Sequence, residues 1–509
     1  MTADAGAVAD IDGLTISADR ALLKRRSVRG AGVTMAAQGV RCLLQFTSQV
    51  ALAHWLLPRE FGLVAMVAPV LTLVQIFNDL GLSQATVQRA NISYQELSAL
   101  FWINLAVSLA LACLLAAAAP AIAWFYHVPR LTYIVLACAS LLLLSGGAAQ
   151  QIALMNRRMQ FIGLAAIDVA CAVAAISVGL LAAWDGFGAW SLVMMQAANS
   201  LTILILAWTM SDWVPSWPGP RQSVGGLLRF GGHLTGFNLL AYAEANLGTI
   251  LIGRMDGAAA LGFYDRAYKL VIVPWWQISL PVARVAISLL SRLNTHPRDY
   301  AAAWRRMLRG LLLVAGPGLL WAAITADDLS PALLGPAWRA AAPMMCDLSL
   351  ATVLVPFGAS AYWLFVSQGR VREQLHYGLI SGAAIVASVV IGVHWGANGV
   401  ARSFAVFAVF VQCVPLWGAT RSGPVNALFA WRAAWPVMLG LAASVGGVTA
   451  VALVCANAPV WARLVLLLGA SYASCGLLLL LIPAGRGVLR EIWQMREALQ
   501  KPRQEAVLF

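Results

Sequence analysis

Long apolar stretches separated by short polar connections dominate this chain. An α-helix needs about 20 residues to cross the hydrocarbon core of a bilayer. Hydrophobic residues make up 61% of the 509 positions and charged residues only 11%, so the chain could not cover itself with a polar surface in water. Because backbone polar groups in lipid must be satisfied within each segment, these stretches are predicted to be helices. We therefore predict an all-α polytopic membrane protein with about 14 transmembrane helices.

Breaks in the apolar pattern divide the predicted helices into two lobes. The longest break, Ser211 to Arg221, contains three prolines and two tryptophans, a composition typical of an interfacial connection. The predicted spans are 31–55, 61–87, 97–122, 131–153, 161–183, 187–209, 228–252, 261–291, 307–326, 340–366, 374–394, 397–420, 433–455 and 460–482. The predicted organisation is a cytoplasmic tail (1–29), an N-lobe of six helices (30–210), a cytoplasmic linker (211–227), a C-lobe of six helices (228–421), two further helices (422–484) and a basic amphipathic cytoplasmic tail (485–509).

Lysine and arginine are distributed unevenly between the connections. With the N-terminus placed in the cytoplasm, the inner connections and tails hold about three times as many of the 34 Lys and Arg residues as the outer ones. This bias predicts that both termini are cytoplasmic. It also accounts for the net charge of +13 without a nucleic acid partner, because the arginines flank spans instead of lining an aromatic-rich groove.

A weak internal repeat is visible at an offset of roughly 200 to 210 residues. Phe61-Gly62-Leu63 lies opposite Leu261-Gly262-Phe263, and each follows the first span of its half. Two further pairs keep the same order: Trp184 to Ser191 with Trp395 to Ser403, and Arg157 and Arg158 with Arg370 and Arg372. Six helices per repeat is an even number, so the halves are predicted to be related by a pseudo-two-fold axis along the membrane normal.

Several ionisable residues lie inside predicted spans, where burying a charge in hydrocarbon costs about 2.5–3.5 kcal/mol even on lenient scales. The first two spans and the two equivalent spans of the second half are the most polar, and we predict that they line a central hydrated cavity. Guanidinium groups match phosphate oxygens, while amides suit sugars, so the cavity is suited to an anionic, hydroxyl-rich cargo. The candidate substrate-binding residues are Arg41, Gln38, Gln45, Asn246 and Arg284.

The alternative is that such charges form structural pairs between helices, for example Arg41 with Asp79. Asp168 and Asp347 fit that structural interpretation better than a role in the cavity. Asp79 and Glu244 are candidates for coupling to H⁺ or Na⁺, because a buried and unpaired carboxylate can titrate.

A charged patch on the predicted outer side contains Arg254, Arg266 and Lys269. We consider it either an outer gate or a solvated loop with salt bridges. No metal or other cofactor is expected, because the eight cysteines lie singly without a CxxC pair and the six histidines form no HExxH motif.

Four motifs follow one another in the chain: Leu56-Leu-Pro-Arg-Glu-Phe-Gly-Leu-Val-Ala-Met66, Asp79-Leu-Gly-Leu-Ser-Gln-Ala-Thr-Val-Gln88, Leu251-Ile-Gly-Arg-Met-Asp-Gly257 with Leu261-Gly-Phe-Tyr-Asp-Arg-Ala267, and Leu334-Gly-Pro-Ala-Trp338. This series resembles the Wzx-type polysaccharide-transport branch of the multidrug/oligosaccharidyl-lipid/polysaccharide flippase superfamily, and within it the exopolysaccharide group. Members of that family often have a proline-containing segment where this chain has Val285 to Arg292.

The resemblance implies a two-lobed flippase of the bacterial inner membrane. Such a protein moves undecaprenyl-diphosphate-linked oligosaccharide repeat units from the cytoplasmic to the periplasmic leaflet by alternating access, for exopolysaccharide or lipopolysaccharide biosynthesis. The implied partners are this lipid-linked oligosaccharide and membrane lipids, with a polysaccharide polymerase and export machinery as further candidates.

Flipping makes and breaks no covalent bond, so we expect a carrier and not an enzyme. Two alternatives stay open. A multidrug or metabolite antiporter of the same superfamily would share the fold but is expected to have a more aromatic or anionic cavity. A membrane polysaccharide polymerase or ligase usually has a large outer loop, longer than any outer connection predicted here.

Overall fold

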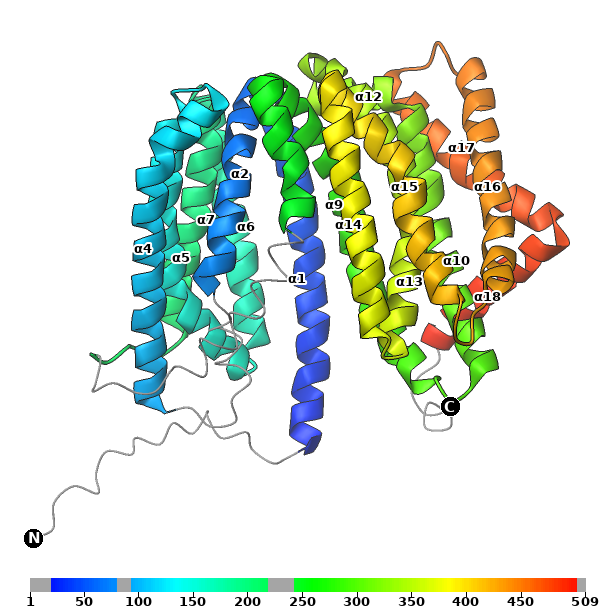
Figure 1. The fold of residues 1–509 in the computed structure, drawn as a ribbon, viewed down its shortest axis with the longest axis horizontal. Coiled ribbons are helices and arrows are strands. Elements are labelled where there is room, and N and C mark those ends of the chain that lie inside the picture. The colour runs from blue at the N-terminus through cyan, green and yellow to red at the C-terminus, as the bar shows by residue number, and fades with distance from the viewer. Residues whose placement is uncertain (1–19, 80–92, 218–241, 501–509) are drawn as a thin grey trace, which may run out of the picture. The chain divides into compact units, whose positions relative to one another are not determined.

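The computed structural model describes residues 20–79, 93–217 and 242–500 (Figure 1). These ranges are helical apart from short connections, and they contain no β-strand. Contacts within the chain divide it into two units, Met1–Ala259 and Ala260–Phe509. The predicted all-α fold is therefore confirmed.

The first unit is built from long helices that pack mainly as hairpins of consecutive helices (Figure 1). Helices α4 and α5 pack along each other, as do α6 and α7, while α1 packs against α6. The helices are α1 (Arg20–Trp55), α2 (Pro58–Asp79), α4 (Tyr94–Tyr126), α5 (Leu131–Arg157), α6 (Phe161–Trp184), α7 (Ala189–Met210) and an unlabelled helix over residues 242–255.

Local sequence signals set the ends of these helices. Ser93 and Glu96 form a capping box at the start of α4, in which the Glu96 carboxylate accepts a hydrogen bond from the Ser93 amide at 2.8 Å. The C-cap of α4 is His127, which adopts a left-handed conformation with φ of 57°. The turn between α6 and α7 uses Gly186 and Gly188 at φ of 80° and 57°. A turn this short places α6 and α7 side by side as a hairpin.

The second unit contains the remaining described helices: α9 (Gly257–Arg292), α10 (Pro297–Ile324), α11 (Ala326–Leu334), η1 (Pro336–Ala341), α12 (Ala342–Val353), α13 (Val355–Ser367), α14 (Val371–Gly392), η2 (Val393–Trp395), α15 (Gly396–Thr420), α16 (Ala427–Val454), α17 (Val460–Leu481) and α18 (Pro483–Gln500). The first three residues of α9 belong to the first unit. Trp304 and Trp363 are fully buried in the core of the second unit.

The helix pattern follows the predicted spans closely. Within the described residues, eleven stretches are long and apolar enough to cross a membrane, and one of them, Val371–Thr420, contains both α14 and α15. The total of fourteen spans stays a prediction.

Some helix boundaries differ from the predicted ones, and three of these differences have a local cause. The predicted span 340–366 is divided into α12 and α13 at Leu354, near Pro356, whose backbone cannot donate a hydrogen bond. Helix α10 begins at Pro297, before the predicted span 307–326, and α1 begins at Arg20, before the predicted span 31–55. The first turns of both helices are charged, so they lie outside the apolar stretches from which the spans were predicted.

In each half of the chain, an arginine donates hydrogen bonds to the carboxyl end of the last helix of that half. This arginine follows the fourth predicted span of its half. Arg158 donates from Nη1 to the Ser211 carbonyl at 2.9 Å, directly after α7. Arg370 donates from Nη1 to the carbonyls of Ala419 and Ser422, both at 2.9 Å, at the end of α15. Each cation complements the negative end of a helix dipole. Hydrogen bonding to Glu373 also raises the pKa of the Arg370 guanidinium. The same kind of hydrogen bond in both halves supports the predicted internal repeat.

Candidate functional site

Arg41 lies on α1 and forms an ion pair with Asp168 on α6. Its Nη1 is 3.3 Å from Asp168 Oδ1, and the two side chains keep 40% and 47% of their surface exposed. An ion pair this exposed typically contributes about 0–1 kcal/mol. Arg41 is therefore held in place only weakly and stays accessible to another anion.

The partner of Arg41 was not identified from the sequence, which suggested Asp79 as one alternative. Asp79 is the last residue of α2, and its side chain lies outside the described residues. Asp168 was predicted to fit a structural pair between helices, but Arg41 was not named as its partner.

The two candidate glutamines, Gln38 and Gln45, are both exposed on α1 with Arg41 between them. The other candidates of the first unit lie on the helix over residues 242–255, where Glu244 and Asn246 are half-buried. The Asn246 amide donates to the Tyr242 carbonyl at 3.0 Å, one turn earlier on the same helix. These residues therefore belong to two separate helices of the first unit.

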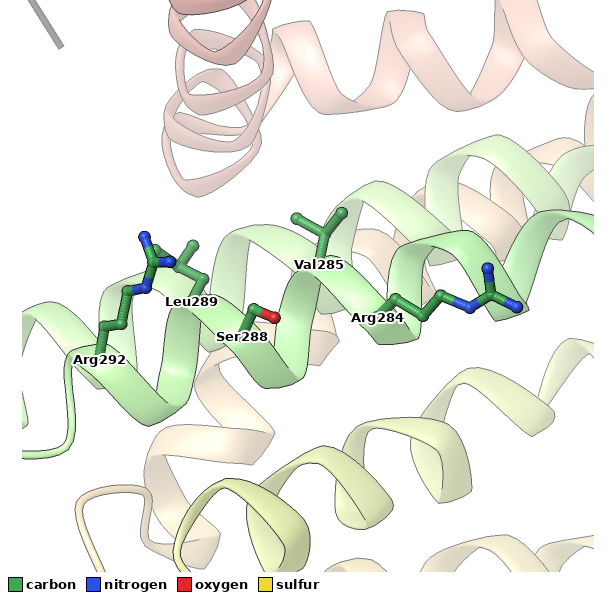
Figure 2. A pocket seen from close by; sticks show the side chains of 5 residues that line it. All are labelled: Arg284, Val285, Ser288, Leu289 and Arg292. Carbon is green, nitrogen blue, oxygen red and sulfur yellow. The ribbon is translucent and has the colours of Figure 1, made fainter. Parts of the chain in front are cut away.

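Arg284 lines an open pocket on α9 in the second unit. The pocket has a volume of about 430 Å³, and its five lining residues come from one face of this helix: Arg284, Val285, Ser288, Leu289 and Arg292 (Figure 2). Neither arginine forms an ion pair with any other residue in the described part of the chain. Ser288 and Arg292 were not among the predicted site residues. The spacing of four residues from Arg284 to Ser288, and again from Ser288 to Arg292, was a signal in the sequence that could have identified them.

Two of the predicted gate residues, Arg266 and Lys269, share one carboxylate near the other end of α9. Arg266 Nη2 is 2.8 Å from Asp265 Oδ2, and Lys269 Nζ is 2.9 Å from Asp265 Oδ1. The Arg266 side chain is only 6% exposed. The salt bridges of the second alternative are present, but both residues lie in helix α9 and not in a loop. The role of these residues as a gate stays a prediction.

Arg254, the third predicted gate residue, is exposed in the first unit. Its guanidinium carbon lies 5.7 Å from the centre of the Phe125 ring, within the range of a cation–π contact. Arg254 thus contacts an aromatic ring of the first unit.

The described residues contain no group of three or more His, Cys, Asp or Glu side chains that could hold a metal ion. The candidate residues are cations and amides on α1, on the helix over residues 242–255 and on α9. Arg41 belongs to the first unit and Arg284 to the second, so a cavity shared by both arginines stays a prediction.

Helices long enough to span a bilayer, arranged in two units, define a polytopic α-helical membrane protein. Residues 51–343, more than half of the chain, match the family model described as "Polysaccharide biosynthesis protein". The chain belongs to this family.

Curated relatives support the same assignment. The chain is 27% identical over 333 residues to the teichuronic acid biosynthesis protein TuaB of Bacillus subtilis (strain 168), covering 63% of this chain and 68% of that protein. It is 22% identical over 408 residues to the lipopolysaccharide biosynthesis protein WzxC of Escherichia coli (strain K12), with coverages of 78% and 83%. It is 25% identical over 380 residues to the succinoglycan biosynthesis transport protein ExoT of Rhizobium meliloti (strain 1021), with coverages of 72% and 76%.

Solved structures confirm the fold. The lipid II flippase MurJ, in an inward closed conformation, aligns with a TM-score of 0.70 at 10% identity, covering 89% of this chain and 98% of that one. An inward-facing multidrug resistance transporter of the MATE family, within the MOP superfamily, aligns with a TM-score of 0.55 at 15% identity, covering 77% and 98%.

Proposed function

We propose that this protein is a flippase that moves undecaprenyl-diphosphate-linked oligosaccharide repeat units from the cytoplasmic to the periplasmic leaflet for exopolysaccharide or lipopolysaccharide biosynthesis. The observation that carries the proposal is Arg284, an exposed arginine on a spanning helix that lines a pocket of about 430 Å³ in a chain of the polysaccharide biosynthesis family. A cation at such a position is costly unless it serves an anionic ligand or a water-filled pathway.

The chemistry of the candidate residues suits this substrate. A guanidinium can donate two parallel hydrogen bonds to a phosphate, so Arg284 and Arg41 are suited to a diphosphate. Asp168 holds Arg41 only weakly, and a diphosphate with more negative charge can replace it. The amides of Gln38, Gln45 and Asn246 are suited to the hydroxyl groups of the first sugars.

The proposed cycle follows from the amphipathic nature of the substrate. The diphosphate and first sugars leave the inner leaflet for the polar residues while the polyprenyl tail stays in lipid. A change between inward-open and outward-open states then presents the head group to the other side. Asp79 and Glu244 are the proposed residues for coupling this change to H⁺ or Na⁺.

The relatives support a transport role and a saccharide substrate. ExoT is named as a succinoglycan biosynthesis transport protein, and MurJ is a flippase of lipid II. Membership in the polysaccharide biosynthesis family favours a carrier of lipid-linked saccharides over the multidrug or metabolite antiporter. The name of ExoT as a transport protein supports a carrier over a polymerase or ligase.

The proposed location is the bacterial inner membrane, with both termini in the cytoplasm. The excess of Lys and Arg in the predicted inner connections supports this orientation. Membrane lipids are expected partners, and a polysaccharide polymerase with its export machinery is the proposed consumer of the flipped units. Arg254, Arg266 and Lys269 are proposed to lie at the outer end of the pathway.

The proposal is tested by reconstituting the full-length protein into proteoliposomes with a fluorescent undecaprenyl-diphosphate oligosaccharide. A membrane-impermeant quencher then reports the fraction of the lipid in the outer leaflet. Wild-type protein should make all of the probe accessible to the quencher, whereas the variant Arg41→Ala with Arg284→Ala should not. Arg298→Ala removes an exposed arginine at the start of α10 and serves as the matched control.

Two results would contradict different parts of the proposal. If wild-type protein does not move the probe, the function is wrong. If the double variant moves it as fast as wild type, the function stands and the assignment of the two arginines is wrong. A loss of transport in Arg298→Ala as well would show that the effect reflects net charge and not the site.

A further inference from the structure

The pocket on α9 contains a second cation that the proposed function does not use. Arg292 is the last residue of α9 and lines the same pocket as Arg284. Ser288 lies between them, four residues from each, so the three polar side chains follow one face of the helix. All three are exposed.

The two arginines do not form a single clamp in this structure. Eight residues of α-helix rise by about 12 Å, which is longer than a diphosphate. Figure 2 shows the Arg292 guanidinium beside Leu289, whereas the Arg284 guanidinium points along the helix away from Arg292. The pocket therefore offers two separate positions for an anion, one at each end.

Apolar side chains flank the polar face of this pocket. Val285 is 64% exposed and Leu289 is 40% exposed. A ligand that lies here can place an anionic group on Arg292 and Ser288 while its hydrocarbon chain contacts Leu289 and Val285. This combination is the chemistry of an amphiphile with a phosphate head and an apolar tail.

We propose that Arg292 and Ser288 form a loading site for the diphosphate of a polyprenyl-linked substrate, from which the head group passes to Arg284. The inference rests on the proposed function, which names the substrate and its direction. Arg292 lies at the end of α9 that the charge pattern assigns to the cytoplasmic side, where the substrate is expected to be bound first.

The position of this site at the end of a helix favours transient binding of an anion. The C-terminus of a helix carries a partial negative charge, which weakens the binding of an anion there. Arg292 compensates for that charge and can donate two hydrogen bonds, and the Ser288 hydroxyl can donate one more. A loading site must release its ligand, so moderate affinity fits the role.

Binding is measured with undecaprenyl diphosphate that carries no sugar, added to the full-length protein in nanodiscs of phosphatidylcholine. Arg292→Ala should weaken binding by about tenfold or more, as expected for the loss of a charge-assisted hydrogen-bond pair. Arg292→Lys should retain part of the affinity, and the control Arg298→Ala should bind like wild type.

Two binding results would overturn the loading site. One is unchanged affinity in Arg292→Ala. The other is binding of phosphatidylglycerol to the wild type as tightly as undecaprenyl diphosphate, with the same dependence on Arg292. That result would make the pocket a site for ordinary anionic phospholipid.

The flipping assay separates the loading site from the deeper one. Arg292→Ala should raise the half-saturating substrate concentration by about tenfold and leave the maximal rate within about twofold of wild type. Arg284→Ala should lower the maximal rate. A lowered maximal rate with unchanged half-saturation in Arg292→Ala would overturn the proposed order of the two positions.

The two proposals fail in different ways. A wild-type protein that binds undecaprenyl diphosphate through Arg292 but does not flip the oligosaccharide lipid would contradict the function and leave the binding site standing. A wild-type protein that flips the lipid, with Arg292→Ala indistinguishable in both assays, would contradict the loading site alone. Thermal unfolding of each variant should match that of the wild type.

Discussion

The two ends of helix α9 carry cations in opposite settings. Near its start, Arg266 and Lys269 share the carboxylate of Asp265, and the Arg266 side chain is 6% exposed. Near its end, Arg284 and Arg292 line an open pocket without an ion pair to any described residue. One end is a buried and compensated ion cluster, and the other is a cationic surface.

This difference teaches how to separate structural arginines from functional ones in a membrane protein. A cation whose charge and hydrogen bonds are satisfied by its own chain should matter mainly for folding. A cation that is left accessible on a spanning helix should matter mainly for a ligand. In the sequence, Arg266 stands in a charged patch next to Asp265, whereas Arg284 stands alone in an apolar segment.

The largest expected effect follows from removing the shared carboxylate in Asp265→Ala. This change removes the Asp265 carboxylate from the buried Arg266, and breaking one partner of a buried ion pair costs about 3–5 kcal/mol. We expect a marked drop in the thermal unfolding temperature of the purified protein. The control is Asp256→Ala, which removes an exposed carboxylate just before α9 and should have little effect. Equal stability of the two variants would contradict the structural role of the cluster.

A smaller loss is expected for Glu491→Ala, which detaches α18 from α10. Glu491 accepts hydrogen bonds from Arg305 at 2.7 Å and from Arg309 at 2.9 Å. Each of these bonds to a charged group is worth about 1.5–3 kcal/mol at most, because the Arg305 side chain is 30% exposed and Arg309 keeps its bond to the Ala433 carbonyl at 2.9 Å. The loss should therefore be smaller than for Asp265→Ala.

Hydrogen exchange of the α18 backbone would measure this loss directly, and we expect faster exchange in Glu491→Ala. The matched control is Glu373→Ala, which removes an exposed partner of Arg370 and should cost at most about 1 kcal/mol. Unchanged exchange in α18 would mean that its contacts with the core, and not Glu491, hold it in place.

The sequence was sufficient to predict most helices, because their apolar runs and caps are local signals. It also marked Arg158 and Arg370 as repeat positions, although it did not show that both bond the end of the following hairpin. The break at Leu354 had a local signal in Pro356 that the prediction did not use. These features depend on a few neighbouring residues, and such features are readable from one sequence.

The pairing of charges could not be predicted in the same way. Arg41 and Asp168 are 127 residues apart, and Arg309 and Glu491 are 182 apart. Whether two such residues meet depends on the packing of whole helices, which a single sequence does not specify. Arg266 and Arg284 show the consequence, since their opposite settings became visible only with the packing of α9.

The Arg41–Asp168 pair should show a still smaller effect on stability. Both side chains are nearly half exposed, so Asp168→Asn should cost at most about 1 kcal/mol of unfolding free energy. The same change removes the competitor of a bound diphosphate, so undecaprenyl diphosphate should bind more tightly than to the wild type. Asp185→Asn, an exposed carboxylate at the end of α6, is the control for the change in net charge. Weaker binding in Asp168→Asn would mean that Asp168 positions Arg41 instead of competing for it.

The smallest effect on stability is expected for Arg284→Gln, at the open end of α9. Surface substitutions away from packed features usually change stability by at most about 0.5 kcal/mol, so the unfolding temperature should stay near that of the wild type. The matched comparison is Arg266→Gln at the buried end, which should lower the unfolding temperature because it removes one of the two cations that compensate Asp265. The flipping rate should show the opposite order. Among correctly folded molecules, Arg284→Gln should lose more of the flipping rate than Arg266→Gln. If Arg284→Gln instead destabilises the protein as much as Arg266→Gln, then Arg284 is a structural cation and the two ends of α9 do not differ in role.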